Sequence, residues 1–145
     1  MIQFDEKRLK QIARAQGLDL IVLFGSQATG RARPDSDIDM AARLRPGHTL
    51  TPDRKSRLAA ALAAVFPAAE VDVTILNEAG SMLLFEVATS GRPLFERRPL
   101  LYWQFQSYAA RRYDDDHKYR LPRAAYLKRR TKQWAREKKI SSAKS

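Results

Sequence analysis

A glycine-serine turn and a pair of aspartates are the residues of this chain whose types and spacing best support chemistry. Gly25 and Ser26 follow segment 19–24, whose apolar β-branched and aromatic residues are typical of a buried strand. A turn of this kind into a helix presents backbone N–H groups and a hydroxyl to an anion, and glycine lets the backbone approach a phosphate closely. The sequence therefore predicts a phosphate-binding loop that begins at Gly25.

Two carboxylates follow this loop in segment 36–41, where polar and apolar residues alternate. On a strand, Asp37 and Asp39 lie on the same face, because successive side chains point to opposite faces. Two adjacent carboxylates repel each other unless a cation lies between them. Mg²⁺ suits such oxygen ligands, since it binds through one or two carboxylates together with substrate phosphates. This pattern predicts a metal-nucleotide site.

A third acid, Asp72, stands in the strand pattern of segment 70–76. An unpaired charge among valines and isoleucine would be costly, so we expect Asp72 to face the same cluster. Three carboxylates beside a phosphate loop can hold two metal ions about 4 Å apart, which activate an attacking hydroxyl and stabilise the leaving oxygen. Each feature alone also fits a plain turn, a solvated strand face or an exposed edge residue. Their combination in this order favours the metal-nucleotide site.

The pattern formed by Gly25, Ser26, Gly30, segment 36–39 and Asp72 resembles the minimal nucleotidyltransferase group of the DNA polymerase β superfamily. The resemblance extends over residues 5–115, because segments 91–95 and 113–114 resemble the closing segment and the final helix of that group. It implies an α+β fold, with a small mixed β-sheet and helices packed on one side. It also implies a reaction in which a hydroxyl attacks the α-phosphorus of ATP and releases pyrophosphate.

The same resemblance assigns roles to individual residues. It implies that Gly25 and Ser26 hold the nucleotide triphosphate and that Ser36 braces the first aspartate. It implies that two Mg²⁺ ions bind to a catalytic triad formed by Asp37, Asp39 and Asp72.

Many small members of this group resemble antitoxins paired with a helical ribonuclease toxin of the HEPN type, and some transfer AMP to a tyrosine of that toxin. The resemblance thus implies an antitoxin that adenylylates a HEPN toxin within a hetero-oligomer. Two alternatives remain open: an antitoxin that neutralises its toxin by binding without catalysis, and a nucleotidyltransferase that acts on an RNA end. Transfer to a cationic antibiotic is less favoured, because the basic C-terminal region would repel that substrate.

Length and composition fit a small domain with an extension. The 145 residues are expected to divide into a nucleotidyltransferase domain over 1–115 and a basic C-terminal helix and tail over 116–145. The chain has no cysteine, which excludes disulfides and thiolate metal sites, and its two histidines lie far apart in the sequence. No signal-peptide core and no apolar run of membrane-spanning length is visible, so the sequence predicts a cytoplasmic protein.

Charge is concentrated in the last third of the chain. Residues 1–96 hold 12 basic and 12 acidic side chains, whereas residues 97–145 hold 15 basic and 4 acidic ones, which accounts for the net charge of +11. Segment 121–139 places Ala124, Leu127, Thr131 and Trp134 along one stripe among lysines and arginines. This basic amphipathic helix could be a solvated tail, a contact for an acidic protein or a contact for nucleic acid.

Capping residues and apolar stripes predict helices that begin after Asp5 and Thr51, and another across 81–88. In the helix that follows residue 100, helical spacing predicts that Leu101, Phe105 and Tyr108 pack on the core and that Tyr102 and Trp103 partly face elsewhere. The three aspartates at 114–116 are expected to form a solvated turn.

Overall fold

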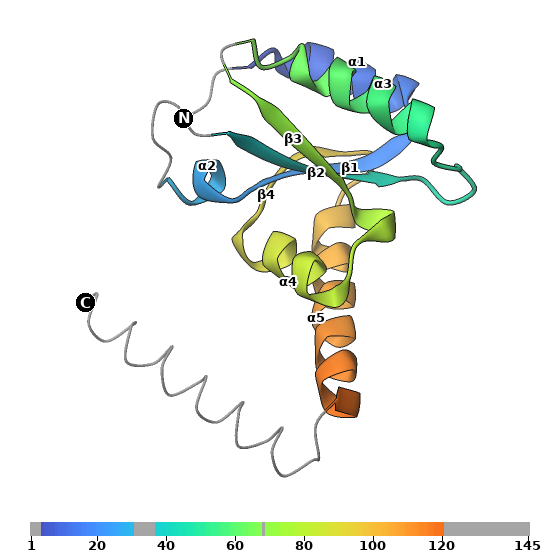
Figure 1. Cartoon of the computed structure of the whole chain (residues 1–145), viewed down its shortest axis with the longest axis vertical. Coiled ribbons are helices and arrows are strands. Elements are labelled where there is room, and N and C mark those ends of the chain that lie inside the picture. Colours follow the sequence, from blue (N-terminus) through green and yellow to red (C-terminus); the bar gives the residue numbers. More distant parts are fainter. Residues whose placement is uncertain (1–3, 31–36, 68, 121–145) are drawn as a thin grey trace.

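A mixed sheet with strand order β3-β2-β1-β4 forms the centre of the computed structural model, which describes residues 4–30, 37–67 and 69–120 (Figure 1). Its strands are β1 (Leu18–Phe24), β2 (Ile38–Leu44), β3 (Val71–Ile75) and β4 (Arg92–Glu96). β1 pairs antiparallel with both β2 and β4, and β2 pairs parallel with β3. The predicted small mixed sheet is therefore confirmed.

Helices alternate with these strands along the chain. They are α1 (Glu6–Ala15), the short α2 (Ser26–Thr29), α3 (Pro52–Ala63), α4 (Ser81–Ser90) and α5 (Leu101–Arg120), together with the 3-10 helix η1 (Leu76–Glu78). The predicted caps are present. The Asp5 carboxylate accepts a hydrogen bond from the Arg8 amide at 3.1 Å, and the Thr51 hydroxyl accepts one from the Arg54 amide at 3.1 Å.

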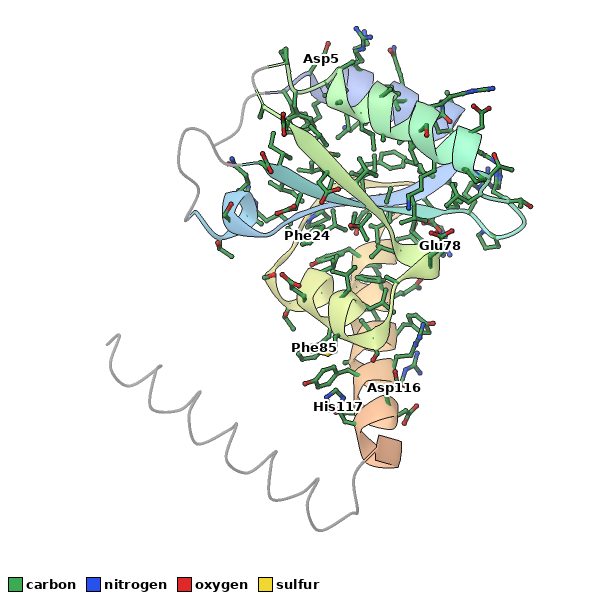
Figure 2. All side chains as sticks on the ribbon, viewed as in Figure 1. Asp5, Phe24, Glu78, Phe85, Asp116 and His117 are labelled. Carbon is green, nitrogen blue, oxygen red and sulfur yellow. The ribbon has the colours of Figure 1, made fainter. Side chains whose placement is uncertain are left out.

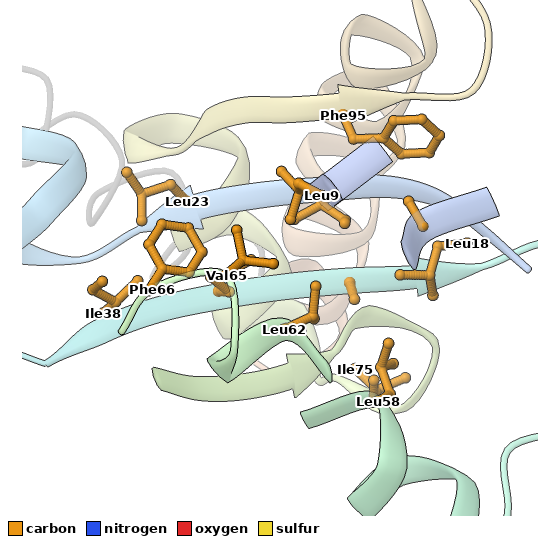
Figure 3. Close-up of a cluster of buried hydrophobic side chains, with 14 of the residues drawn as sticks. Leu9, Leu18, Leu23, Ile38, Leu58, Leu62, Val65, Phe66, Ile75 and Phe95 are labelled. Carbon is orange, nitrogen blue, oxygen red and sulfur yellow. The ribbon is translucent and has the colours of Figure 1, made fainter. Parts of the chain in front are cut away.

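Helices cover both faces of the sheet, not one as expected (Figure 1). Because side chains alternate along a strand, Ile21 and Leu23 pack with α1 and α3, whereas Leu20, Val22 and Phe24 pack with α4 and α5. Figure 3 shows the cluster on the first of these faces. All residues of β1 are buried, including Asp19, as expected for a largely apolar strand that is covered on both sides.

The buried stripe of α5 differs from the predicted one. Leu101, Tyr102, Phe105 and Ala109 are buried, whereas Tyr108 is 43% exposed and Trp103 is 63% exposed. The expectation for Tyr102 and Tyr108 was therefore wrong, while that for Trp103 is confirmed. Helical spacing alone fits both stripes, and the packing of α5 against α4 decides between them.

The expected turn at 114–116 was also wrong, because α5 continues as a helix through these aspartates. The Tyr113 ring stacks on the ring of Phe85 in α4 with 4.2 Å between centroids, and it lies 3.9 Å from the ring of His117. Figure 2 shows Phe85 and His117 near each other along the α4–α5 pair. These contacts hold the helix on both sides of the aspartates.

Several sequence expectations lie outside what the structure tests. Segment 121–139 and the C-terminal tail are not among the described residues, so the basic amphipathic helix stays a prediction, as does the domain boundary between residues 115 and 116. Within the described part of the chain, no helix combines the length and the apolar character that crossing a bilayer requires.

Candidate active site

The predicted loop is a strand–turn–helix unit at the end of β1. Gly25 has φ 74° and ψ −153°, a backbone region that is almost restricted to glycine. It caps the short helix α2, which Gly30 ends with φ 75°. The Ala28 and Thr29 amides both donate to the Gly25 carbonyl, at 3.2 Å and 3.3 Å, so the chain turns directly from the strand into a helical turn. Figure 2 shows Phe24 where β1 gives way to this turn.

The carboxylate of Asp39 lies directly against this loop. A Cβ atom built on Gly25 would overlap Oδ2 of Asp39 and lie 3.2 Å from its Cγ. Glycine is therefore required at position 25 for two reasons: the backbone conformation and the space that the carboxylate occupies. The Gly25 loop and the first acid of β2 are thus in direct contact.

Strand register brings Asp39 and Asp72 together at one end of the sheet. Asp39 lies opposite Phe24 of β1 and opposite Asp72 of the parallel strand β3. Side chains at paired positions project on the same face. Asp37 directly precedes β2, and its charge helps to raise the pKa of the Asp39 carboxyl. The face that carries Asp39 and Asp72 is the one covered by α4 and α5. Phe24, which lies opposite Asp39, and Ala41, two residues further along β2, both pack against these helices.

Asp72 reaches this position for a different reason from the one expected. It is exposed on the edge strand β3, so the premise that it lies among apolar side chains was wrong. The apolar residues of β3, Val71, Val73 and Ile75, project to the opposite face and pack with α1 and α3. The placement of Asp72 beside Asp39 follows from parallel pairing alone.

The electrostatics of the site favour a cation. Burial raises the pKa of the Asp39 carboxyl, and the charges of Asp72, Asp37 and Glu86 raise it further. Among the described residues, none of the predicted triad takes part in a salt bridge. Within residues 4–30, 37–67 and 69–120, the acids at this end of the sheet are therefore not ion-paired with lysine or arginine.

Glu86 is a fourth acid near Asp39 that the sequence analysis missed. It lies on α4, and its effect on the pKa of Asp39 depends on how α4 packs against β1. No local pattern in segment 81–88 distinguishes Glu86 from an ordinary exposed helix residue. Its place in the site could be found only from the tertiary structure.

The donor set fits Mg²⁺ in its chemistry. Carboxylate oxygens are the ligands that this ion prefers, and their mutual repulsion at Asp39 is what a cation would relieve. In the described ranges no three carboxylate or histidine groups converge closely enough to hold one ion. The side chains of Asp37 and Asp72 are exposed, so they can change rotamer to reach a metal. Ser36 lies outside the described residues.

The chain belongs to the polymerase beta nucleotidyltransferase family. The family described as "Polymerase beta, Nucleotidyltransferase" matches residues 7–100, a range that contains the loop at Gly25 and all three acids. This match confirms the resemblance and makes the chain a nucleotidyltransferase by family. A comparison with curated proteins found no match.

Several solved structures with the same fold are described as toxin-antitoxin complexes. A "toxin-antitoxin with AMP-PNP" has a TM-score of 0.62 and 24% identity, covering 94% of this chain and 98% of that chain. A "tri-AMPylated Shewanella oneidensis HEPN toxin in complex with MNT antitoxin" has a TM-score of 0.56 and 22% identity, covering 94% and 95%. The "toxin-antitoxin MntA-HepT" has a TM-score of 0.55 and 22% identity, covering 94% and 96%. At these identities the likeness establishes the fold.

Proposed function

We propose that this chain transfers AMP from ATP to a tyrosine hydroxyl of a HEPN-type ribonuclease toxin and thereby acts as the antitoxin of that toxin. The observation that carries the proposal is the meeting of Asp39, Asp72 and the Gly25 loop at one end of the sheet. Family membership supports the reaction class. The structures with the same fold, which hold AMP-PNP or an AMPylated HEPN toxin, support this choice of nucleotide and acceptor.

In this proposal the loop binds the nucleotide. The turn at Gly25 and the hydroxyl of Ser26 hold the triphosphate, and Ser36 braces Asp37. The carboxylates of Asp37, Asp39 and Asp72 bind two Mg²⁺ ions. When bound, Mg²⁺ neutralises charge on the phosphates and stabilises the charge that develops on the leaving oxygen.

The reaction exchanges one phosphorus–oxygen bond for another. The tyrosine oxygen forms a bond to the α-phosphorus, and the bond from that phosphorus to the bridging oxygen breaks, so that pyrophosphate leaves with the electron pair. The proton of the tyrosine hydroxyl passes to Asp72, which faces the acceptor from the exposed edge of the sheet. Positioning of the two reactants and charge stabilisation supply most of the rate.

Label transfer tests this proposal directly. The full chain is incubated with α-phosphate-labelled ATP, MgCl₂ and a co-expressed HEPN toxin, and the variants Asp37→Asn and Asp39→Asn are compared with Asp53→Asn. Asp53 is a matched control, because it is an exposed carboxylate on α3, ion-paired with Arg57. We expect label on the toxin with the wild type and the control, and a loss of at least about 100-fold with either site variant. Undiminished transfer by both site variants would refute the proposal.

A second candidate function is neutralisation by contact alone. The structures with the same fold are complexes of an antitoxin with its toxin, which supports a stable protein partner. Protection of toxin-expressing cells by Asp39→Asn would favour this function over catalysis. Label on added cell RNA, in place of toxin, would instead favour nucleotide addition to an RNA end.

We place the proposed activity in the cytoplasm, where ATP and Mg²⁺ are available.

A further inference from the structure

Basic side chains gather at the end of the sheet that is opposite the three acids. β1 and β2 are antiparallel, so the end of β2 lies beside the start of β1, where β4 also ends. Arg45 follows β2 and Arg97 follows β4. Six residues of strand at about 3.3 Å each place this end about 20 Å from Asp39. A ligand bound there would not occupy the nucleotide site.

Backbone hydrogen bonds bring three arginines together at this end. The Gly17 amide donates to the Arg14 carbonyl at 3.3 Å, and the Arg45 amide donates to the Gly17 carbonyl at 2.9 Å. The Arg97 amide donates to the Asp19 carbonyl at 2.9 Å. We call Arg14, Arg45 and Arg97 the arginine cluster. Its members come from the last turn of α1 and from the ends of two strands, so only the tertiary structure assembles it.

Two further basic groups border the arginine cluster. A Cβ atom built on Gly17 would overlap the ring of His48 and lie 3.3 Å from Nη2 of Arg54. Arg54 Nη2 donates to the carbonyl of Gln16 at 2.8 Å, which fixes this guanidinium beside the end of α1. The His48 ring is exposed. The surface around Gly17 is therefore basic on several sides.

The acids near the arginine cluster are already engaged. Asp19, which is 8% exposed, accepts from Arg43 Nε at 2.9 Å and from Arg43 Nη2 at 3.2 Å. The Glu96 carboxylate accepts from the Tyr102 amide at 2.9 Å. Within the described ranges no salt bridge includes a member of the arginine cluster. Arg14 Cζ lies over the Phe95 ring, 5.8 Å from its centroid, but among the described residues no carboxylate is ion-paired with the cluster.

The Arg97 guanidinium lies close enough to Arg14 and Arg45 for their positive charges to act on it. Its Nε donates to the Leu18 carbonyl at 3.1 Å, but its Nη2 is buried and has no hydrogen-bond partner among the described residues. Burial lowers the pKa of Arg97, and the charges of Arg45 and Arg14 lower it further, while Asp19 acts in the opposite direction. An anion bound to the exposed Arg14 and Arg45 would relieve this repulsion.

We propose that the arginine cluster binds the phosphate backbone of single-stranded RNA. Guanidinium groups match phosphate oxygens in a two-pronged geometry, and both Arg14 and Arg45 are exposed. The exposed His48 ring offers a surface on which an unpaired base can stack. Residues 97–145, with 15 basic and 4 acidic side chains, add charge of the same sign, which favours a ligand with many phosphates. This RNA contact does not depend on the proposed transfer reaction.

Salt-dependent binding tests the proposal. Fluorescence anisotropy of a labelled single-stranded RNA of about 16 nucleotides is measured with the full chain across a series of salt concentrations. The double variant Arg14→Gln/Arg45→Gln is compared with Arg8→Gln/Arg111→Gln, which removes the same charge from exposed positions on α1 and α5. We expect the slope of log K against log salt to fall by about 1.4 in the cluster variant, from two lost phosphate contacts, and to stay unchanged in the control.

Three outcomes would overturn the proposal. An unchanged slope in the cluster variant would exclude these arginines as phosphate ligands, and equal reductions in both double variants would indicate a response to net charge alone. Displacement of the RNA by polyglutamate as effectively as by unlabelled RNA would point to an acidic protein as the ligand. AMP transfer by the cluster variant is expected to match the wild type, so failure here is distinguishable from failure of the proposed function.

Discussion

Replacing Gly25 by alanine tests whether the Asp39 carboxylate lies against the loop. The backbone at φ 74° and ψ −153° costs a residue with a side chain about 1–3 kcal/mol. The new methyl group would also overlap Oδ2 of Asp39, so the carboxylate must move. Urea denaturation is expected to report both contributions as a lower free energy of unfolding. Transfer of AMP should fall about 100-fold, because a displacement near 1 Å in a catalytic group has an effect of this size.

Gly47→Ala separates backbone strain from the overlap. Gly47 has φ 87°, and a Cβ atom built on it meets nothing within 4 Å. Its replacement should lower the free energy of unfolding by about 1–2 kcal/mol from the left-handed backbone alone. Transfer activity should not change, because nothing connects Gly47 to the acids.

A double-mutant cycle isolates the contact with Asp39. In an Asp39→Ala background the carboxylate is gone, so Gly25→Ala should retain only its backbone strain. We expect its cost to fall by about 0.5–3 kcal/mol relative to the wild-type background, which is the usual range of coupling between neighbouring residues. An equal cost of Gly25→Ala in both backgrounds would refute the placement of the carboxylate against the loop.

Three further predictions concern stability, each measured by urea denaturation. The raised pKa of Asp39 means that the folded state binds this proton more tightly than the unfolded state, so wild-type stability falls as the pH rises through that pKa. Asp39→Asn should therefore be more stable than the wild type at about pH 7 and equal to it at about pH 3. Lower stability of this variant at both pH values would contradict the direction of the pKa shift. Tyr102→Phe removes a hydroxyl that donates to the Val87 carbonyl at 2.9 Å, near the end of α4, and should lower the free energy of unfolding by about 1–3 kcal/mol. The exposed Tyr108→Phe should lower it by at most about 0.5 kcal/mol. Similar losses in both variants would count against this contact. Asp19→Asn leaves the Arg43 guanidinium without an opposite charge beside it and should cost about 3 kcal/mol. A loss no larger than that of the exposed Asp53→Asn would show that this partly buried pair contributes little.

Local patterns predicted much of the fold and part of the site. The caps at Asp5 and Thr51 and the strand that ends at Phe24 depend on residues a few positions apart. Backbone conformation, capping and the two-residue period of a strand act over that range, so the sequence alone was enough to determine them.

The remaining features depend on contacts between segments that are distant in the chain. Asp72 joins Asp39 only because β3 pairs parallel with β2 in one register, and Glu86 joins them only because α4 packs against β1. The burial of Tyr102 and the arginine cluster at Gly17 arise in the same way. Register and helix packing are decided by the burial of both faces of the sheet at once, which no local pattern contains. The sequence thus determined which residues could do the chemistry, and the tertiary structure decided which of them meet.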